Sequence, residues 1–453
     1  MEKGSIDARS LVLEEKQFIE ELNLTERAGI FRKIDWHLLP FVAPRNANIA
    51  GMSTDLNLIG FRYNIAAAVN IVLKLFRPSR WIPTIMVMWG IVMTLMCLVN
   101  SFESLVIARM CLGLAGAGLF PGVNYYICRW YPRSERSKRI SIFFSAAIIA
   151  GAFSGFLAYA IDNMEGIGGL HGWQWIFCLE GLATIVVACL SVFFIHDSPE
   201  TATFLTEPER EYIMDVLKLD ANHLSTDYSI QFISQAMKDY KLYIQVLIYM
   251  GLLVPGYAIT LFLPTIINEL GYSSTNAQLL SVTPYVASCL AAIIVGIYSD
   301  KYNLRGPYII GGASVSLVGF ILLYCSSRPG PSYIGVCLAA TGTYAPVAVI
   351  IAWVGSNAGG DVRRGVALAM VMGLGTFEGT VCSCFIYVDP PRFHIGHGTI
   401  MGFLSLAIST TLFTMWNFNR LNKKKEAQCQ AEGITEDRSS EFTNMGDDSP
   451  LFR

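Results

Sequence analysis

Hydrophobic residues in this chain fall into long runs separated by short polar segments. A helix that crosses a membrane needs roughly 20 mostly apolar residues, because it rises about 1.5 Å per residue and the hydrocarbon core is about 30 Å thick. Ten windows meet this requirement: Trp81 to Val99, Leu105 to Ile127, Ile140 to Ile161, Trp175 to Ile195, Leu242 to Ile267, Leu279 to Tyr298, Tyr308 to Cys325, Tyr333 to Val354, Val366 to Tyr387 and Ile400 to Phe418. The pattern predicts an all-α membrane protein.

Two shorter hydrophobic runs, Trp36 to Ala43 and Asn64 to Leu73, precede these ten windows. Each has about half the length that a span requires. Hydrophobic residues make up 53% and charged residues 15% of the 453 residues, which is typical of polytopic membrane proteins. Residues 1 to 35 are charged and lack the apolar core and cleavage site of a secretory signal, so we expect a cytosolic amino terminus.

Basic residues concentrate in alternate loops between the predicted spans. Twelve lie on one side, whereas only Arg328 and Arg392 lie on the other. The twelve are Lys74, Arg77, Arg80, Arg129, Arg133, Arg136, Lys138, Arg139, Lys301, Arg305, Arg363 and Arg364. The positive-inside rule places these loops, and both termini, in the cytosol.

The spans also repeat along the chain. The starts at Trp81, Leu105, Ile140 and Trp175 recur at Tyr308, Tyr333, Val366 and Ile400, with offsets of 227, 228, 226 and 225 residues. A constant offset is what a duplicated six-helix unit predicts. The second half begins at Leu242, 66 residues before Tyr308, but Trp36 lies only 45 residues before Trp81. The first half is thus about 21 residues short, and the shortage falls in its first two helices.

This division predicts two six-helix halves, with ten full spans and a truncated first hairpin. We expect a cytosolic segment over 1–35, an N-terminal half over 36–195, a cytosolic central loop over 196–241, a C-terminal half over 242–418 and a disordered tail over 419–453. Within the central loop, Thr206 and Glu209 form a capping-box pattern that opens a short helix reaching about Leu219.

Long stretches of the chain resemble a known family. The resemblance covers nearly everything from Phe31 to about Phe418. The matching segments include RKIDWHLLPF, LFRPSRWIPTIMVMWGIV, GLFPGVNYY, DSPETATFLTEPER and AWVGSNAGGDVRRGVALAM. The chain resembles a fungal member of the anion:cation symporter family within the major facilitator superfamily, of the allantoate permease-like or nicotinate transporter-like kind. The resemblance implies a proton symporter of a small organic anion.

Two departures from that family fall in the short runs. Pro44 follows Ala43 where relatives have a full first helix ending in an Asp-Arg pair, and Asn70 follows Val69 where relatives continue through an acidic stretch. A splice variant, a gene-model error and a decayed paralogue would each produce such gaps, and the sequence does not separate them. No residue here matches the missing acidic and Asp-Arg groups.

Charged residues inside spans are costly and are often functional. Arg109 lies about five residues into its helix and either snorkels to the interface or binds a substrate carboxylate in bidentate fashion. The resemblance favours substrate binding. Glu180, at a similar depth, either couples to protons or is an interfacial carboxylate. Glu378, near the midplane, is either a proton-coupling group or a neutral, hydrogen-bonded acid, since burial disfavours its charged form.

Aromatic and amide side chains form a second set of candidates for substrate binding. They are Asn124, Tyr125, Tyr257, Trp353 and Asn357. Rings that stack on a planar anion and amides that orient it suit a mostly apolar pocket. Helix packing and the interfacial aromatic belt are the alternatives for each of them.

A gating loop follows the eighth family helix. Gly296 to Lys301, followed by Arg305 and Gly306, resembles the superfamily's Gly-x-x-x-Asp-Arg/Lys motif. The resemblance implies that Asp300, Lys301 and Arg305 bridge helix ends when the transporter faces outward.

The 11 cysteines are odd in number and include no CxxC pair, so we expect apolar packing, with a disulfide or metal role as the alternative. The spans hold no catalytic constellation, and no phosphate-binding loop occurs in the cytosolic segment. We therefore predict no enzyme activity, no cofactor, no metal and no nucleic-acid partner.

Together these features predict a secondary active transporter of a small organic anion, with protons, the anion and the bilayer as its partners. We expect a monomer in the plasma membrane. The alternative is a non-transporting membrane protein, either receptor-like or inactivated by the truncation.

Overall fold

A computed structural model describes eleven segments of the chain: residues 29–35, 78–116, 118–162, 166–169, 171–220, 235–270, 274–326, 328–359, 361–375, 393–434 and 449–450. The two short hydrophobic runs and Glu378 lie outside the described residues.

The described residues form helices joined by turns. A short helix over residues 29–35 is followed by α5 (Pro78–Leu95), α6 (Phe102–Gly116), α7 (Leu119–Trp130), α8 (Arg136–Asp162), α9 (Gly172–Ser191), α10 (Glu207–Asp220), α12 (Tyr240–Glu269), α13 (Ser274–Lys301), α14 (Gly306–Cys325), α15 (Pro329–Asn357), α16 (Asp361–Gly375) and α18 (His394–Glu432).

Eight of these described segments are long and apolar enough to cross a membrane. They confirm eight of the ten predicted spans, with α6 and α7 together forming one of them. The other two predicted spans coincide with α8, a helix of 27 residues, and with α16, which is described as far as Gly375. The predicted all-α membrane fold is therefore confirmed.

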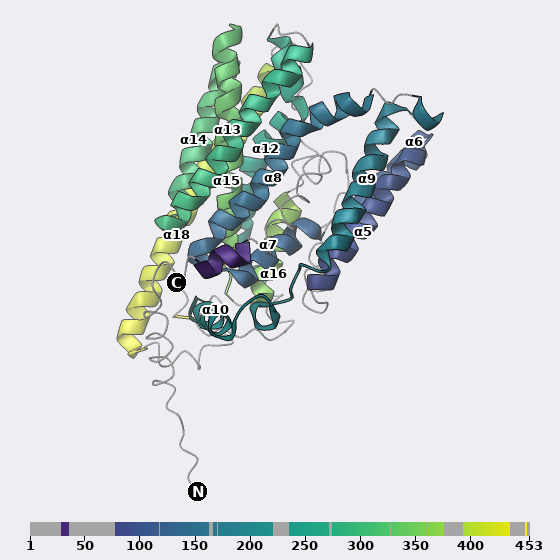
Figure 1. The fold of residues 1–453 in the computed structure, drawn as a ribbon. Helices are drawn as coiled ribbons and strands as arrows, with labels where there is room; N and C mark the ends of the chain where they lie inside the picture. Colours follow the sequence, from purple (N-terminus) through teal and green to yellow (C-terminus); the bar gives the residue numbers. More distant parts are fainter. Residues whose placement is uncertain are drawn as a thin grey trace.

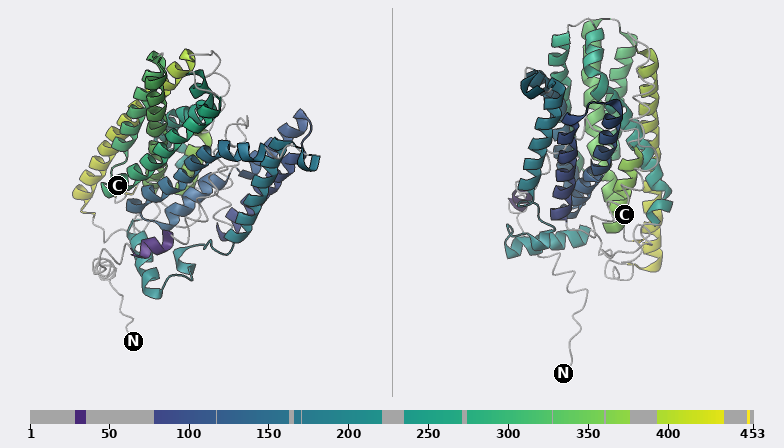
Figure 2. Two further views of the ribbon diagram at one scale, coloured as in Figure 1. Left: turned by 45° about the horizontal axis from the view of Figure 1, so that its top comes forward. Right: turned by 90° about the vertical axis from the view of Figure 1, so that its right-hand side faces the viewer.

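The helices form two groups (Figure 1). α5, α6 and α9 lie together, and α12, α13, α14, α15 and α18 form the other group, while α8 packs against α13 and α15. The groups meet at the end where α10 lies and diverge toward the opposite end (Figures 1 and 2). We call the end with α10 the basic end, because basic residues of the charge bias, such as Arg133 and Arg136, pair there with Asp220 of α10. The two-half architecture follows from this arrangement.

Small residues let the helices approach closely, as is usual between membrane helices. A Cβ on Gly181 of α9 would lie 2.6 Å from the Thr94 nitrogen and 2.9 Å from the Gly90 carbonyl oxygen of α5. In the other group, a Cβ on Gly319 of α14 would lie 2.7 Å from the Gly335 oxygen of α15. Glycine at these positions therefore fixes how tightly α5 meets α9 and α14 meets α15.

The last helix is longer than the sequence predicted. α18 continues past Phe418 to Glu432, so the expectation of a disordered tail from Asn419 is wrong over these residues. The added turns are rich in Lys, Glu, Gln and Ala, which are strong helix formers even where little packs against them. The helix stops at Gly433, whose φ of 61° suits a glycine cap.

The expected helix in the central loop is confirmed. Glu209 accepts a hydrogen bond from the Thr206 backbone nitrogen at 2.8 Å, as a capping box requires, and α10 runs from Glu207 to Asp220. α10 lies across the ends of the other helices (Figure 2). Lys33 of the first short helix pairs with Glu209 at 2.8 Å and ties the two together.

Replacing Gly181 by alanine should destabilise the protein, whereas replacing Gly311 of α14 should not. The new methyl group at position 181 overlaps α5, and overpacking of this kind costs about 1–3 kcal/mol. A Cβ at Gly311 meets no atom within 4 Å, and alanine there gains about 1 kcal/mol of helix propensity. Thermal unfolding of the two purified variants in detergent measures the difference. Equal unfolding temperatures would contradict the close contact between α5 and α9.

Candidate functional site: a charged lock at the basic end

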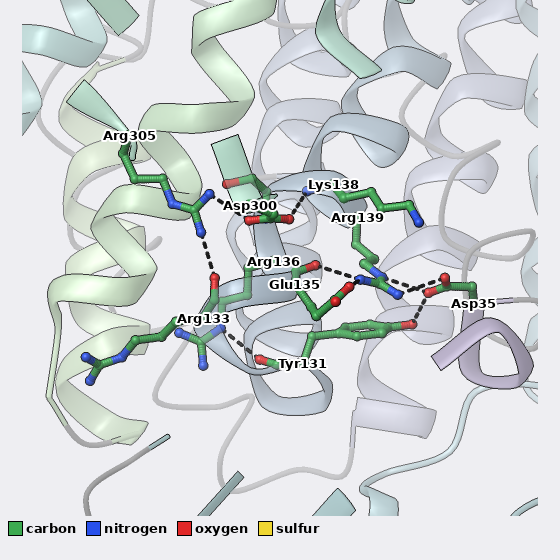
Figure 3. Close-up of polar contacts among 10 residues, drawn as sticks. Asp35, Tyr131, Arg133, Glu135, Arg136, Lys138, Arg139, Asp300 and Arg305 are labelled. Atoms are coloured by element: carbon green, nitrogen blue, oxygen red, sulfur yellow. Dashed lines mark hydrogen bonds and ion pairs between the residues drawn. The ribbon is translucent and has the colours of Figure 1, made fainter. Parts of the chain in front are cut away.

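The best-defined polar site joins the two halves through Asp300, near the end of α13 (Figure 3). Its two carboxylate oxygens accept hydrogen bonds from the backbone nitrogens of Ser137 at 3.1 Å and Lys138 at 2.7 Å. These are the second and third residues of α8, so Asp300 caps a helix of the other half. Its negative charge also lies at the positive end of the α8 dipole.

Glycine is required four residues before this carboxylate. A Cβ on Gly296 would lie 2.7 Å from the Cβ of Ser141 and 3.1 Å from the Ser137 carbonyl oxygen. α13 can therefore bring Asp300 to the end of α8 only if position 296 has no side chain. The spacing of Gly296 and Asp300 is one turn of helix, which places both on the face that meets α8.

Two arginines extend the link between the halves. Arg305 pairs with Asp300 at 2.6 Å and donates to the Arg133 carbonyl oxygen at 2.6 Å. Arg136, almost fully buried, donates to the carbonyl oxygens of Gly355 in α15 and Cys128 in α7. Asp220, the last residue of α10, pairs with Arg136 at 3.3 Å. We call Asp300, Arg305, Arg133, Arg136 and Asp220 the lock.

A second carboxylate holds the first short helix against the lock. Arg139 is 2% exposed and donates from Nε and Nη2 to the two oxygens of Asp35, at 2.9 and 3.0 Å. Tyr131 donates to Asp35 at 2.9 Å, and Glu135 pairs with Arg139 (Figure 3). Burial raises the pKa of Tyr131 well above its ordinary value, and the nearby Asp35 charge raises it further, so the phenol remains a donor.

The C-terminal half contains a matching ion pair. Asp239, directly before α12, pairs with Arg363 of α16 at 2.6 Å and with Lys241 at 3.3 Å. Arg363 lies 224 residues after Arg139, close to the 226-residue offset of the helices that carry these two arginines. In each half, therefore, an aspartate from earlier in the chain pairs with an arginine at the start of a corresponding helix, α8 or α16. The tertiary structure supports the sequence repeat at this level.

Polar groups also meet within the C-terminal half at membrane depth. The Tyr344 hydroxyl lies 2.7 Å from Thr260 Oγ1 and donates to the Gly256 carbonyl oxygen, while the Tyr285 and Tyr344 ring centroids are 6.2 Å apart. Tyr257, a predicted site residue, lies beside Gly256 in α12. These groups lie roughly 20 to 30 Å along their helices from the basic end. Tyr285, Tyr344 and Thr260 were not singled out from the sequence, although each of them lies inside a predicted span.

Arg109 and Glu180 lie in the other group of helices. The Arg109 guanidinium of α6 lies over the Phe177 ring of α9, 5.3 Å from its centroid. Glu180 follows Phe177 by three residues, about one helical turn, and is half-buried. The Arg109 guanidinium thus meets an aromatic face of α9, and Glu180 lies one turn further along that helix. The tyrosines of the C-terminal half belong to the opposite group.

The remaining candidates lie nearer the basic end. Asn124 is buried in α7, where its Nδ2 donates to the Phe120 carbonyl oxygen and its Oδ1 has no hydrogen-bond partner among the described residues. Tyr125 is buried where α7 packs on α16. Trp353 packs against the Phe418 ring, with centroids 5.8 Å apart, and Asn357 lines a cavity at the end of α15. These residues do not form one cluster with Arg109.

One predicted gating residue is placed differently. Asp300 and Arg305 belong to the lock, but Lys301 is exposed, with Nζ 5.7 Å from the centroid of the Tyr302 ring. Successive residues on a helix point about 100° apart, so a neighbour of Asp300 cannot share its contact with α8. Sequence reasoning missed Arg133 and Arg136 as lock residues, because a basic loop already had an explanation in membrane orientation.

Comparison with known proteins gives the same fold. A family model for the Major Facilitator Superfamily matches residues 65–383. The chain is 30% identical over 492 residues to the MFS-type transporter cnsO of Penicillium expansum, covering 99% of this chain and 95% of that protein. It is 27% identical over 425 residues to the high-affinity nicotinic acid transporter of Saccharomyces cerevisiae, covering 88% of this chain and 79% of that protein.

Solved structures agree with these relatives. The proton:xylose symporter XylE matches with a TM-score of 0.54 and 17% identity, over 91% of each chain. The transporter FucP in its outward conformation matches with a TM-score of 0.57 and 10% identity, over 85% of this chain and 98% of that one. At such identities the likeness shows the fold alone. With the family model matching more than half of its length, this chain belongs to the major facilitator superfamily of membrane transporters.

Proposed function

We propose that the protein carries a small organic anion, a carboxylate such as nicotinate or allantoate, together with protons. The yeast relative named as a nicotinic acid transporter supports this substrate class. Arg109 supports it chemically, since a guanidinium binds a carboxylate through two parallel hydrogen bonds. We place the protein in the plasma membrane as a monomer with cytosolic termini.

The lock is the observation that carries the transport mechanism. It holds the two halves together at the basic end through Asp300 and Arg136, while the groups of helices diverge at the other end (Figure 1). Rocking of two halves about a central site gives alternating access. Opening toward the cytosol then requires Asp300 to leave the end of α8, and closing restores its two backbone hydrogen bonds.

Side chains of both halves would share the substrate. Arg109 meets the carboxylate, while Tyr257 and its neighbour Tyr344 contribute aromatic faces from the other half. The Asn124 Oδ1, buried without a partner among the described residues, accepts a hydrogen bond from the substrate or from water. Glu180 and Glu378 remain the proposed proton-coupling groups.

The competing function is a membrane protein that does not transport. The alignment with the Penicillium transporter is 492 residues long, more than the 453 residues of this chain, so that relative has positions that this chain lacks. Uptake by a second chain, in which the two short runs are lengthened with the corresponding residues of that relative, separates the two cases. Uptake by the lengthened chain alone would support the truncation hypothesis.

Arg109→Gln should lower proton-driven uptake of labelled nicotinate or allantoate by at least about tenfold, because a charged partner of the substrate is removed. Arg109→Lys should keep part of the rate and raise KM, because lysine cannot make the bidentate contact. Arg420→Gln is the matched control, since its guanidinium also lies over an aromatic ring, 5.7 Å from the centroid of Trp416. If all three variants transport alike, Arg109 has only a packing role.

Asp300→Asn should weaken the lock and expose the residues beneath it. Breaking a buried ion pair costs about 3–5 kcal/mol, so the closed state should lose population. Cys128, which is buried beside Gly355 in the lock region, should react at least about tenfold faster with a maleimide in inside-out vesicles. A chain that keeps Cys128 as its single cysteine gives the measurement. Glu207→Gln, which removes an exposed carboxylate of α10, should leave the rate unchanged.

A further inference from the structure

A cavity of about 430 Å³ opens at the basic end of the C-terminal half. Its walls come from the residues before α12, the first turns of α12, the end of α15, the start of α16 and the last part of α18. The lining residues are Gln235, Lys238, Asp239, Tyr240, Lys241, Leu242, Gln245, Asn357, Arg363, Phe418, Leu421, Asn422 and Lys425. All of them follow α10 in the sequence and lie in the C-terminal half or in the segments that flank it.

The walls of this cavity are strongly basic. The lining contains one carboxylate, Asp239, and four cations, Lys238, Lys241, Arg363 and Lys425, so its formal charge is +3. Asp239 contacts two of the four cations, Arg363 at 2.6 Å and Lys241 at 3.3 Å. The net positive charge of the lining residues favours anions in this cavity.

Gln245 adds a buried donor to this basic cavity. Its side chain is 1% exposed, and its Nε2 has no hydrogen-bond partner among the described residues. An unfilled buried amide donor costs about 1–3 kcal/mol, which an acceptor oxygen would recover. Gln245 lies five residues into α12, about 7 Å further along the helix than Tyr240. A basic lining together with a buried amide donor is suited to binding an oxyanion, whose oxygens are charged and accept hydrogen bonds.

The cavity also lies at the level expected for lipid headgroups. Tyr240 lines it and is 52% exposed, and on α18 Trp416 is 57% exposed close to Phe418. Exposed tyrosine and tryptophan are typical of the membrane interface, and basic pockets between helices on the cytosolic side bind lipid headgroups. A phosphate group can reach the cavity from the inner leaflet or from the cytosol.

We propose that this cavity is a phosphate-binding site, occupied by the phosphate of an anionic lipid or by free phosphate. Asn357 lies two residues from Gly355, which accepts a hydrogen bond from Arg136 of the lock. A phosphate bound between α12, α15, α16 and α18 therefore holds the end of α15 in the position that the lock uses. It stabilises the state in which the basic end is closed.

The full chain in nanodiscs of phosphatidylcholine provides the test. One arm adds inorganic phosphate, and the other includes about 10% phosphatidic acid, an anionic lipid that exposes a phosphate at the bilayer surface. We expect a saturable rise in the unfolding temperature in at least one arm. A rise with inorganic phosphate identifies free phosphate as a ligand, and a rise with phosphatidic acid alone identifies the lipid.

Variants then show whether the cavity itself binds the phosphate. Lys238→Gln with Lys425→Gln should raise the apparent Kd about tenfold, because two of the four cations are removed. Gln245→Leu should weaken binding further. Lys423→Gln with Lys424→Gln removes the same charge from exposed residues outside the cavity and should leave Kd unchanged. Equal effects of the two lysine pairs, or no rise in either arm, would overturn the proposal.

Discussion

The closed basic end depends on one carboxylate meeting the start of a helix from the other half. Asp300 accepts hydrogen bonds from the backbone amides of the second and third residues of α8, which would otherwise lack acceptors. It also pairs with Arg305. The contact is possible only because Gly296 lets α13 approach α8. A helix end has a fixed position and direction, so this bond sets the angle between the halves.

Each half also contains an ion pair of its own at the basic end. Asp35 pairs with Arg139 at the start of α8, and Asp239 pairs with Arg363 at the start of α16. Buried arginines of this kind remain charged, so removing the carboxylate that pairs with one of them is strongly destabilising. Each ion pair therefore links elements within its own half, and the lock is the contact that joins the two halves.

The sequence anticipated the fold better than the site. Apolar runs, charge bias and a constant offset depend on bilayer thickness and helix rise, which are the same in every membrane protein. The resemblance pointed to Asp300, Lys301 and Arg305, but a motif does not say which way each side chain points, and only Asp300 and Arg305 form an ion pair here while Lys301 is exposed. Arg136 and Tyr344 were missed, because their partners lie far away in sequence.

By itself, the sequence determined that this chain is helical, repeats once and spans a membrane many times, since these properties follow from local composition. The continuation of α18 to Glu432 was also encoded locally, in residues with high helix propensity. Only the tertiary structure decided that Asp300 caps α8, that Arg109 lies over Phe177 and that Gln245 lines one cavity with four cations. Each of these contacts joins residues from different helices, and their geometry depends on how those helices pack.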